Sequence, residues 1–128
     1  MAKFTSKMPG QLEFESGAVA LGAGTVVVTD LIVDDVSYVG VNLVVATAAL
    51  TALDIFAQFS RDGAWHDISP ADWTAPDGVF VTYASGNLDA AGVGNHAFTI
   101  NVLPLYALRI RGTSAGAAVV TASGTGKR

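Results

Sequence analysis

Hydrophobic and polar residues alternate with a period of two along most of this 128-residue chain. Such alternation places successive side chains on opposite faces of a β-strand, and no stretch shows the three- and four-residue spacing of an amphipathic helix. Together with β-branched residues and turn-forming boundaries, it predicts strands at 11–16, 25–33, 36–45, 53–60, 79–83, 96–102, 106–111 and 117–123. Seven or eight strands without helices predict an all-β fold: a single antiparallel β-sandwich, jelly-roll-like or immunoglobulin-like.

The alternation also predicts which side chains enter the core. It is clearest where Tyr106, Leu108 and Ile110 point inward while Arg109 and Arg111 point outward. The other residues predicted to face inward are Leu12, Phe14, Val39, Val41, Leu43, Val45, Leu53, Ile55, Ala57, Phe59, Phe98, Ile100 and Val102.

Turn-forming residues divide the chain into one domain with two short ends. Asp62-Gly63 predicts a tight hairpin, in which glycine supplies the positive φ and Trp65 begins the return strand. We expect loops at 46–54, 69–78 and 85–95. The predicted organisation is an N-terminal arm (1–10), a β-sandwich domain (11–123) and a C-terminal tail (124–128). Because the arm carries only Phe4 and Met8 as large apolar residues, we expect it to become ordered on a neighbouring molecule.

The composition limits the possible partners. The net charge is −4 with seven scattered basic residues, which argues against direct nucleic-acid binding. Charged residues make up 14% of the chain, against about 25% in typical soluble domains, which indicates that partners cover part of the surface. The N-terminal residues lack the apolar segment of a secretory signal, and the apolar stretch 39–53 is too short and too polar to span a membrane. We therefore expect synthesis in a cytoplasm and no membrane partner.

The chain lacks the residues of the common catalytic and metal sites. There is no cysteine, and neither His66 nor His96 is accompanied by a Gly-x-Ser-x-Gly motif. Alternation places Glu13 and Glu15 on a solvent-facing side of one strand. Two further clusters, Asp62 with His66 and Asp67, and Asp30 with Asp34 and Asp35, lack the spacing of a calcium-binding loop. We expect no enzymatic activity, no cofactor and no metal.

Aromatic and basic side chains remain as candidate binding residues. Trp65, Trp73 and Tyr83, together with Tyr38 and Phe80, would suit a platform on which sugars stack, so a glycan is the alternative ligand. The candidate contacts with partners are Phe4, Met8, Trp65, Trp73, Tyr83, Arg109 and Arg111.

Two segments resemble known protein families. Residues 55–68, with Ser60-Arg61-Asp62-Gly63 followed by Trp65, resemble a hairpin of discoidin-like and related jelly-roll domains. Residues 103–127, with Tyr106-x-x-Arg109-x-Arg111 before a Val/Thr/Gly-rich strand, resemble the C-terminal strand pair of small tailed-bacteriophage structural proteins. The second resemblance implies a virion structural protein. The first departs from secreted discoidin domains because their paired cysteines are missing, which argues against discoidin-like sugar or lipid binding.

These observations favour a virion protein that works through protein–protein contacts. We expect a capsid decoration or cement protein that is localised in the virion, binds the major capsid protein or other virion proteins, and forms a homo-oligomer. The alternatives are a neck or tail component, or a carbohydrate-binding or receptor-adhesion module.

Overall fold

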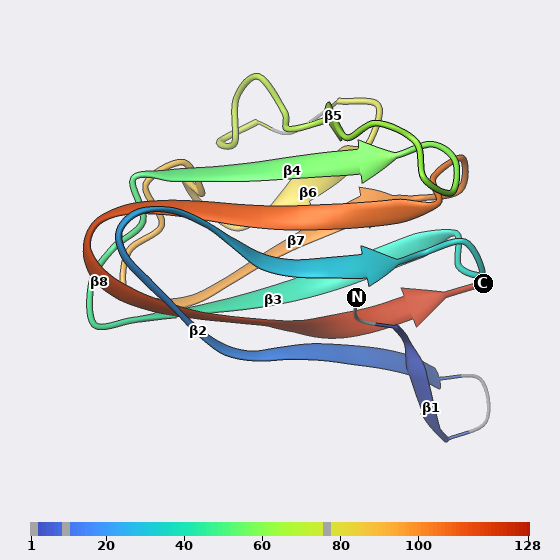
Figure 1. Ribbon diagram of the computed structural model, residues 1–128, viewed down its shortest axis with the longest axis horizontal. Helices are drawn as coiled ribbons and strands as arrows, with labels where there is room; N and C mark the ends of the chain where they lie inside the picture. Colours follow the sequence, from blue (N-terminus) through green and yellow to red (C-terminus); the bar gives the residue numbers. More distant parts are fainter. Residues whose placement is uncertain (1–2, 9–10, 76–77) are drawn as a thin grey trace.

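The computed structural model describes residues 3–8, 11–75 and 78–128, and the regular structure in these ranges is entirely β (Figure 1). Within them there is no helix long and apolar enough to cross a membrane. The strands are β1 (Thr5–Met8), β2 (Gln11–Ile32), β3 (Tyr38–Ala46), β4 (Ala52–Gln58), β5 (His66–Asp67), β6 (Val81–Ala84), β7 (Gly94–Asn101) and β8 (Ala107–Lys127).

Two antiparallel layers share the long strands β2 and β8, which pair with each other along nearly their whole length. The first half of β8 pairs with β4, which in turn pairs with β5, and we call this the front layer. The second half of β8 pairs with β3, and this back layer has the strand order β1-β2-β8-β3-β7-β6. The all-β sandwich is therefore confirmed.

The strand order is that of a jelly roll rather than an immunoglobulin domain. The first and last long strands are neighbours in both layers, and the chain between them passes from the back layer (β3) to the front layer (β4 and β5) and returns (β6 and β7). This arrangement closes two Greek keys around one core.

Two pairs of predicted strands are in fact single bent strands. The predictions 11–16 and 25–33 both lie in β2, and 106–111 and 117–123 both lie in β8. The pairing of β2 with β8 shifts register three times between Glu15 and Gly24, and Gly22 and Gly24 have φ of 63° and 148°. Bulges of this kind bend a strand, so the chain turns from one layer into the other without leaving the sheet.

The predicted core is confirmed with two exceptions. Among the residues predicted to face inward, twelve outside β8 are buried, and so are Leu108 and Ile110 within β8. Tyr106 is only partly buried. Phe59 is 47% exposed, because β4 ends at Gln58 and the alternation does not continue into the turn. Its ring packs edge-on against His66 and Phe80 instead.

Both ends of the described chain join the sheet, so the predictions of a loose arm and a separate tail are wrong for these residues. β1 pairs with β2, and the ring of Phe4 packs edge-on against Phe14 with centroids 5.6 Å apart. β8 continues to Lys127. A Cβ on Gly126 would lie 2.9 Å from Phe4, so the missing side chain makes room for the ring. Phe4 and β1 therefore pack on their own domain.

The predicted hairpin turn is present with a different residue in the left-handed conformation. Asp62 has φ of 61°, and the Gly63 amide donates to the Ser60 carbonyl at 3.0 Å. The return strand β5 begins at His66 rather than Trp65. Aspartate tolerates this conformation better than most residues, which explains why the turn does not require glycine there.

Candidate functional site

Arg109 is held by its own chain on the outer face of the front layer. Its guanidinium donates two hydrogen bonds to the Asp30 carboxylate, at 2.8 and 3.0 Å, and lies 4.2 Å from the centre of the Trp65 ring. β8 pairs Arg109 with Asp30 of β2 on one side and Phe56 of β4 on the other. The hydrogen bond with Asp30 raises the pKa of Arg109.

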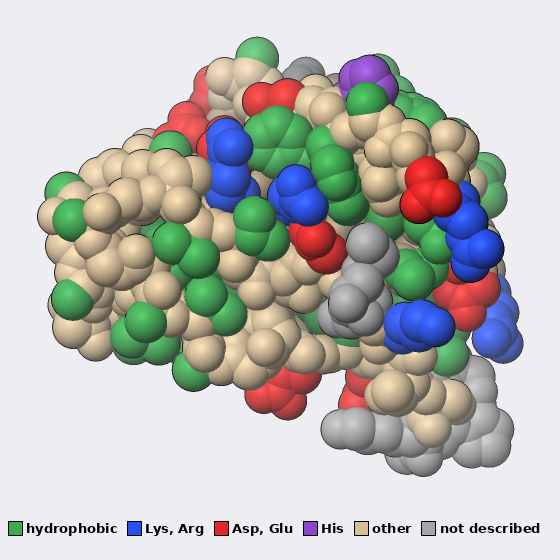
Figure 2. Space-filling model, in the orientation of Figure 1, with side chains coloured by type: hydrophobic (Ala, Val, Ile, Leu, Met, Phe, Trp, Pro, Cys, Tyr) green, Lys and Arg blue, Asp and Glu red, His purple; other side chains and the backbone are tan. Residues whose placement is uncertain are grey.

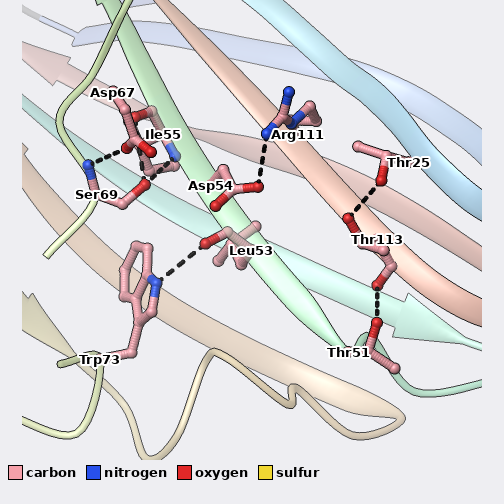
Figure 3. Close-up of polar contacts among 10 residues, drawn as sticks. All are labelled: Thr25, Thr51, Leu53, Asp54, Ile55, Asp67, Ser69, Trp73, Arg111 and Thr113. Atoms are coloured by element: carbon pink, nitrogen blue, oxygen red, sulfur yellow. Dashed lines mark hydrogen bonds and ion pairs between the residues drawn. The ribbon is translucent and has the colours of Figure 1, made fainter. Parts of the chain in front are cut away.

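Arg111 repeats this arrangement one pleat further along β8. It donates to the Asp54 carboxylate at 3.0 Å (Figure 3). Its guanidinium lies 4.5 Å from the centre of the Phe56 ring. Its Nε is buried without a hydrogen-bond partner among the described residues. We call these six residues the arginine ladder: Asp30, Asp54, Phe56, Trp65, Arg109 and Arg111. Basic, acidic and hydrophobic side chains gather over the same strands in Figure 2.

We expect Arg109→Ala to lower the free energy of unfolding by about 1–2 kcal/mol, because the partly buried Asp30 carboxylate loses a bidentate partner and Trp65 loses its cover. The side chains are 29% and 23% exposed, so solvent weakens the ion pair. Urea denaturation followed by tryptophan fluorescence measures the change.

Arg61→Ala is the matched control, since Arg61 is exposed and its hydrogen bond to the Tyr106 hydroxyl is long at 3.5 Å. A double-mutant cycle with Asp30→Asn isolates the pair. Equal effects of Arg109→Ala and Arg61→Ala would mean that the ladder adds nothing to stability.

The three aromatic residues predicted as a platform do not form one. Trp73 is 1% exposed, packs edge-on against Phe98 and donates its indole N–H to the Leu53 carbonyl at 3.1 Å (Figure 3). It is therefore a core residue and not a surface contact. Trp65 is partly covered by Arg109, and only Tyr83, at 56% exposed, presents much of its side chain to solvent.

Of the other residues singled out from the sequence, Phe4, His66 and His96 also contact their own chain. Phe4 is partly buried against its own core, while the side chain of Met8 lies outside the described residues. The His96 ring nitrogen lies 2.7 Å from the Gly92 carbonyl, and His66 packs on Phe59. In the part of the chain that the structure describes, no three histidine or acidic side chains gather in a group that could hold a metal ion.

One end of the sandwich carries no charged side chain over three adjoining segments. These segments are the bend of β2 (16–25), the end of β3 with the β3–β4 loop (46–52), and the bend of β8 (112–119), and we call them the charge-free end. In Figure 2 it is the far left of the molecule, where the surface is tan and green and acidic side chains appear only toward the upper margin. Its exposed residues are Gly17, Ala18, Ala20, Gly22, Ala23, Gly24, Thr25, Thr47, Ala49, Thr51, Ala115 and Ala117.

Hydrogen bonds hold the three segments together. The Thr25 and Thr113 hydroxyls lie 2.8 Å apart, and the Thr51 hydroxyl donates to the Thr113 carbonyl at 3.3 Å (Figure 3). The Thr51 amide donates to the same carbonyl at 2.8 Å. The Ser114 hydroxyl donates to the Ala49 carbonyl at 3.0 Å. The end is thus a firm surface of alanine, glycine and threonine, and a partner can cover it without removing any ion from water.

Sequence reasoning missed this site although its signal is visible. The sequence contains no Asp, Glu, Lys or Arg at 16–29, 36–53 or 112–126. Each run alone is ordinary for strands. Only the register of β2 with β8, and the loop hydrogen bonds to β8, bring the three runs to one end of the molecule.

Comparison with known proteins identifies the fold and not a family. Neither the protein-family models nor the curated proteins contain a sequence that matches the chain. Among solved structures, the SPBc2 prophage-derived protein YomS is similar, with a TM-score of 0.50 and 10% identity over 84% of this chain and 92% of that chain. Pseudomonas aeruginosa AlgX matches with a TM-score of 0.48 and 12% identity, over 85% of this chain and 26% of that chain. A family 29 carbohydrate-binding module matches with a TM-score of 0.40 and 9% identity, over 99% and 76%.

Proposed function

We propose that the protein is a bacteriophage virion structural protein that binds other virion proteins and further copies of itself through its charge-free end. Capsid decoration or cementing is the role that we favour, with the major capsid protein as the partner. The observation that carries the proposal is the convergence of three uncharged segments at one end of a jelly roll. The fold similarity to a prophage-derived protein supports a phage context.

The physical argument concerns the cost of covering a surface. Charged residues are depleted at the centres of protein interfaces, because burying an ion costs free energy unless it is well paired. Arg109 and Arg111 are instead paired with Asp30 and Asp54 in the arginine ladder. Small side chains at the charge-free end also allow a partner to approach closely. In a symmetric shell, many copies of a modest interface add up to a stable attachment.

Charge introduced at this end should reduce incorporation into particles. We expect Ala20→Glu and Ala117→Glu to lower the number of copies per purified particle by about tenfold or more, because each buries an unpaired carboxylate at the interface. The measurement is quantitative mass spectrometry of particles produced by cells that express each variant.

Ala64→Glu is the matched control, since Ala64 is an exposed alanine on the β4–β5 turn at the opposite end. All three variants should melt at the temperature of the parent, because each position is exposed. Normal incorporation of both Ala20→Glu and Ala117→Glu would count against this end as the interface.

A neck or tail component would use the same surface, and the position of the chain within the particle distinguishes it from a decoration protein. The carbohydrate-binding alternative cannot use Trp73, which is in the core, and Trp65 lies against Arg109, so Tyr83 is the one exposed ring of the three aromatic residues predicted for it.

A further inference from the structure

The outer face of the back layer carries a groove that runs across the strands. Two adjoining hollows form it, with volumes of about 490 and 320 Å³, and they share Gly124 and Thr125 of β8. The groove extends from β1 and β2, across β8, β3 and β7, to Tyr83 on β6. Six neighbouring strands at about 4.8 Å spacing make it roughly 24 Å long. It can therefore hold an extended polymer rather than a compact ligand.

The floor of the groove consists of small residues, and its sides carry polar groups. Gly40 and Ala97 leave the floor open, and Thr125 and Thr99 stand beside Gly40 on the paired strands. Asn42 lies next to this floor. At the β1–β2 end the lining residues are Lys3, Thr5, Glu13, Glu15 and Ser123. Hydroxyl, amide and carboxylate groups thus lie beside the groove, most densely at its β1–β2 end.

Tyr83 gives the other end of the groove an aromatic face. It is 56% exposed and sits in register beside Thr99, whose hydroxyl lies 2.9 Å from that of Thr82. The hollow at this end is mostly apolar in its lining. An exposed tyrosine beside a shallow apolar floor presents a ring on which a flat, weakly polar surface can stack.

The strand pairing decides which kind of polymer fits. β8 is paired on both sides, with β2 and β3, and β3 is paired on both sides, with β8 and β7. The backbone donors and acceptors of the floor are used within the sheet, so a peptide cannot bind here as an added strand. Recognition must come from side-chain hydroxyls, amides and carboxylates, together with one aromatic ring. Sugar rings combine hydroxyl edges with apolar C–H faces and match such a lining.

We propose that this cross-strand groove binds a neutral oligosaccharide chain, with Tyr83 stacking on one sugar ring and Asn42, Thr99, Ser123 and Thr125 hydrogen-bonding to hydroxyl groups. The site lies on the back layer, apart from the arginine ladder and from Trp65 and Trp73. It is independent of the virion role, since a virion protein with or without a glycan site would be incorporated by the charge-free end.

Titration of ¹⁵N-labelled protein with cellohexaose, xylohexaose, mannohexaose and chitohexaose, each at millimolar concentration, tests the proposal by amide chemical shifts. We expect at least one hexaose to shift the amides of the groove residues and to leave those of the arginine ladder unchanged. Tyr83→Ala should weaken that binding by about tenfold or more. Tyr38→Ala is the control, because Tyr38 is 45% exposed on a neighbouring part of the same layer but does not line the groove.

A second variant separates the groove from the fold. A Cβ on Gly40 would have its nearest neighbour, the Thr125 hydroxyl, at 3.7 Å, so Gly40→Phe fills the groove without a clash at Cβ. It should abolish binding, whereas Val44→Phe on the same strand should not. The proposal is overturned if no hexaose shifts the groove amides, if binding survives Gly40→Phe, or if a lysine-rich decapeptide shifts these amides and the hexaoses do not.

Discussion

Ile110→Asp should abolish the folded domain. Ile110 is 1% exposed in β8, where it pairs with Thr29 of β2 and Ile55 of β4. The buried polar residues of the described chain are Thr29, Gln58 and Ser114, and none of them carries a positive charge that could pair with a carboxylate. Burying an unpaired charge costs several kcal/mol, which is comparable with the whole stability of a typical domain.

Circular dichroism during heating measures this effect. We expect the parent to show a cooperative transition and Ile110→Asp to show none. Ala117→Asp is the matched control, since it adds the same charge at an exposed position of the same strand and should melt like the parent. If the two variants melt alike, the assigned facing of β8 is incorrect.

Among the Gly→Ala substitutions, Gly124→Ala should lower the free energy of unfolding the most. A Cβ at Gly124 would overlap the backbone oxygen of Gly40 and lie 2.9 Å from the ring of Phe14. Gly124 pairs with Val41 in the ladder between β8 and β3, so the overlap can be relieved only by separating two central strands. Overpacking against side chains costs about 1–3 kcal/mol, and a clash with the backbone should reach at least the upper end of that range.

Gly116→Ala provides the comparison for this prediction. Its Cβ would meet only the Ala48 methyl group at 3.7 Å, which is an ordinary contact. Because alanine lowers the backbone entropy of the unfolded chain, the free energy of unfolding of this variant should rise by up to about 1 kcal/mol. Urea denaturation gives both free energies. A Gly124→Ala protein as stable as Gly116→Ala would show that β3 and β8 are not paired in the register described.

Local alternation was sufficient to predict the fold class and most of the core. It placed Val39, Leu43 and Ile100 correctly because each lies within a regular strand with one face buried. It failed at Phe59, which follows the last residue of its strand, and it divided β2 into two because positive-φ glycines interrupt the pattern without ending the strand. The period-two pattern describes each regular stretch by itself. It does not show that a strand continues past a bulge and stays paired with the same neighbour.

The candidate sites were less predictable because they depend on pairing between distant segments. The outward direction of Arg109 and Arg111 followed from the sequence, but their partners Asp30 and Asp54 lie 79 and 57 residues away. Trp73 has a polar, proline-bounded context that is typical of a surface loop, yet the loop folds back and inserts the indole beside Phe98. Three strand pairings, of β8 with β3, β3 with β7 and β7 with β6, are required before Thr125, Gly40 and Tyr83 lie on one face.

The two surfaces suggest a division of labour within one small domain. The charge-free end would attach the protein to its particle, and the groove on the back layer would remain open to a glycan. The arginine ladder then has a supporting role, since it holds β2, β8 and β4 together on the front layer.

A reconstruction of particles purified from cells that carry the gene, combined with mass spectrometry of the same sample, tests the virion role most directly. The account predicts that the chain is present in many copies per particle, that the jelly roll fits the density, and that the charge-free end faces a neighbouring virion protein or a second copy. Particles that lack the chain, or that hold it with the charge-free end fully exposed to solvent, would contradict the account.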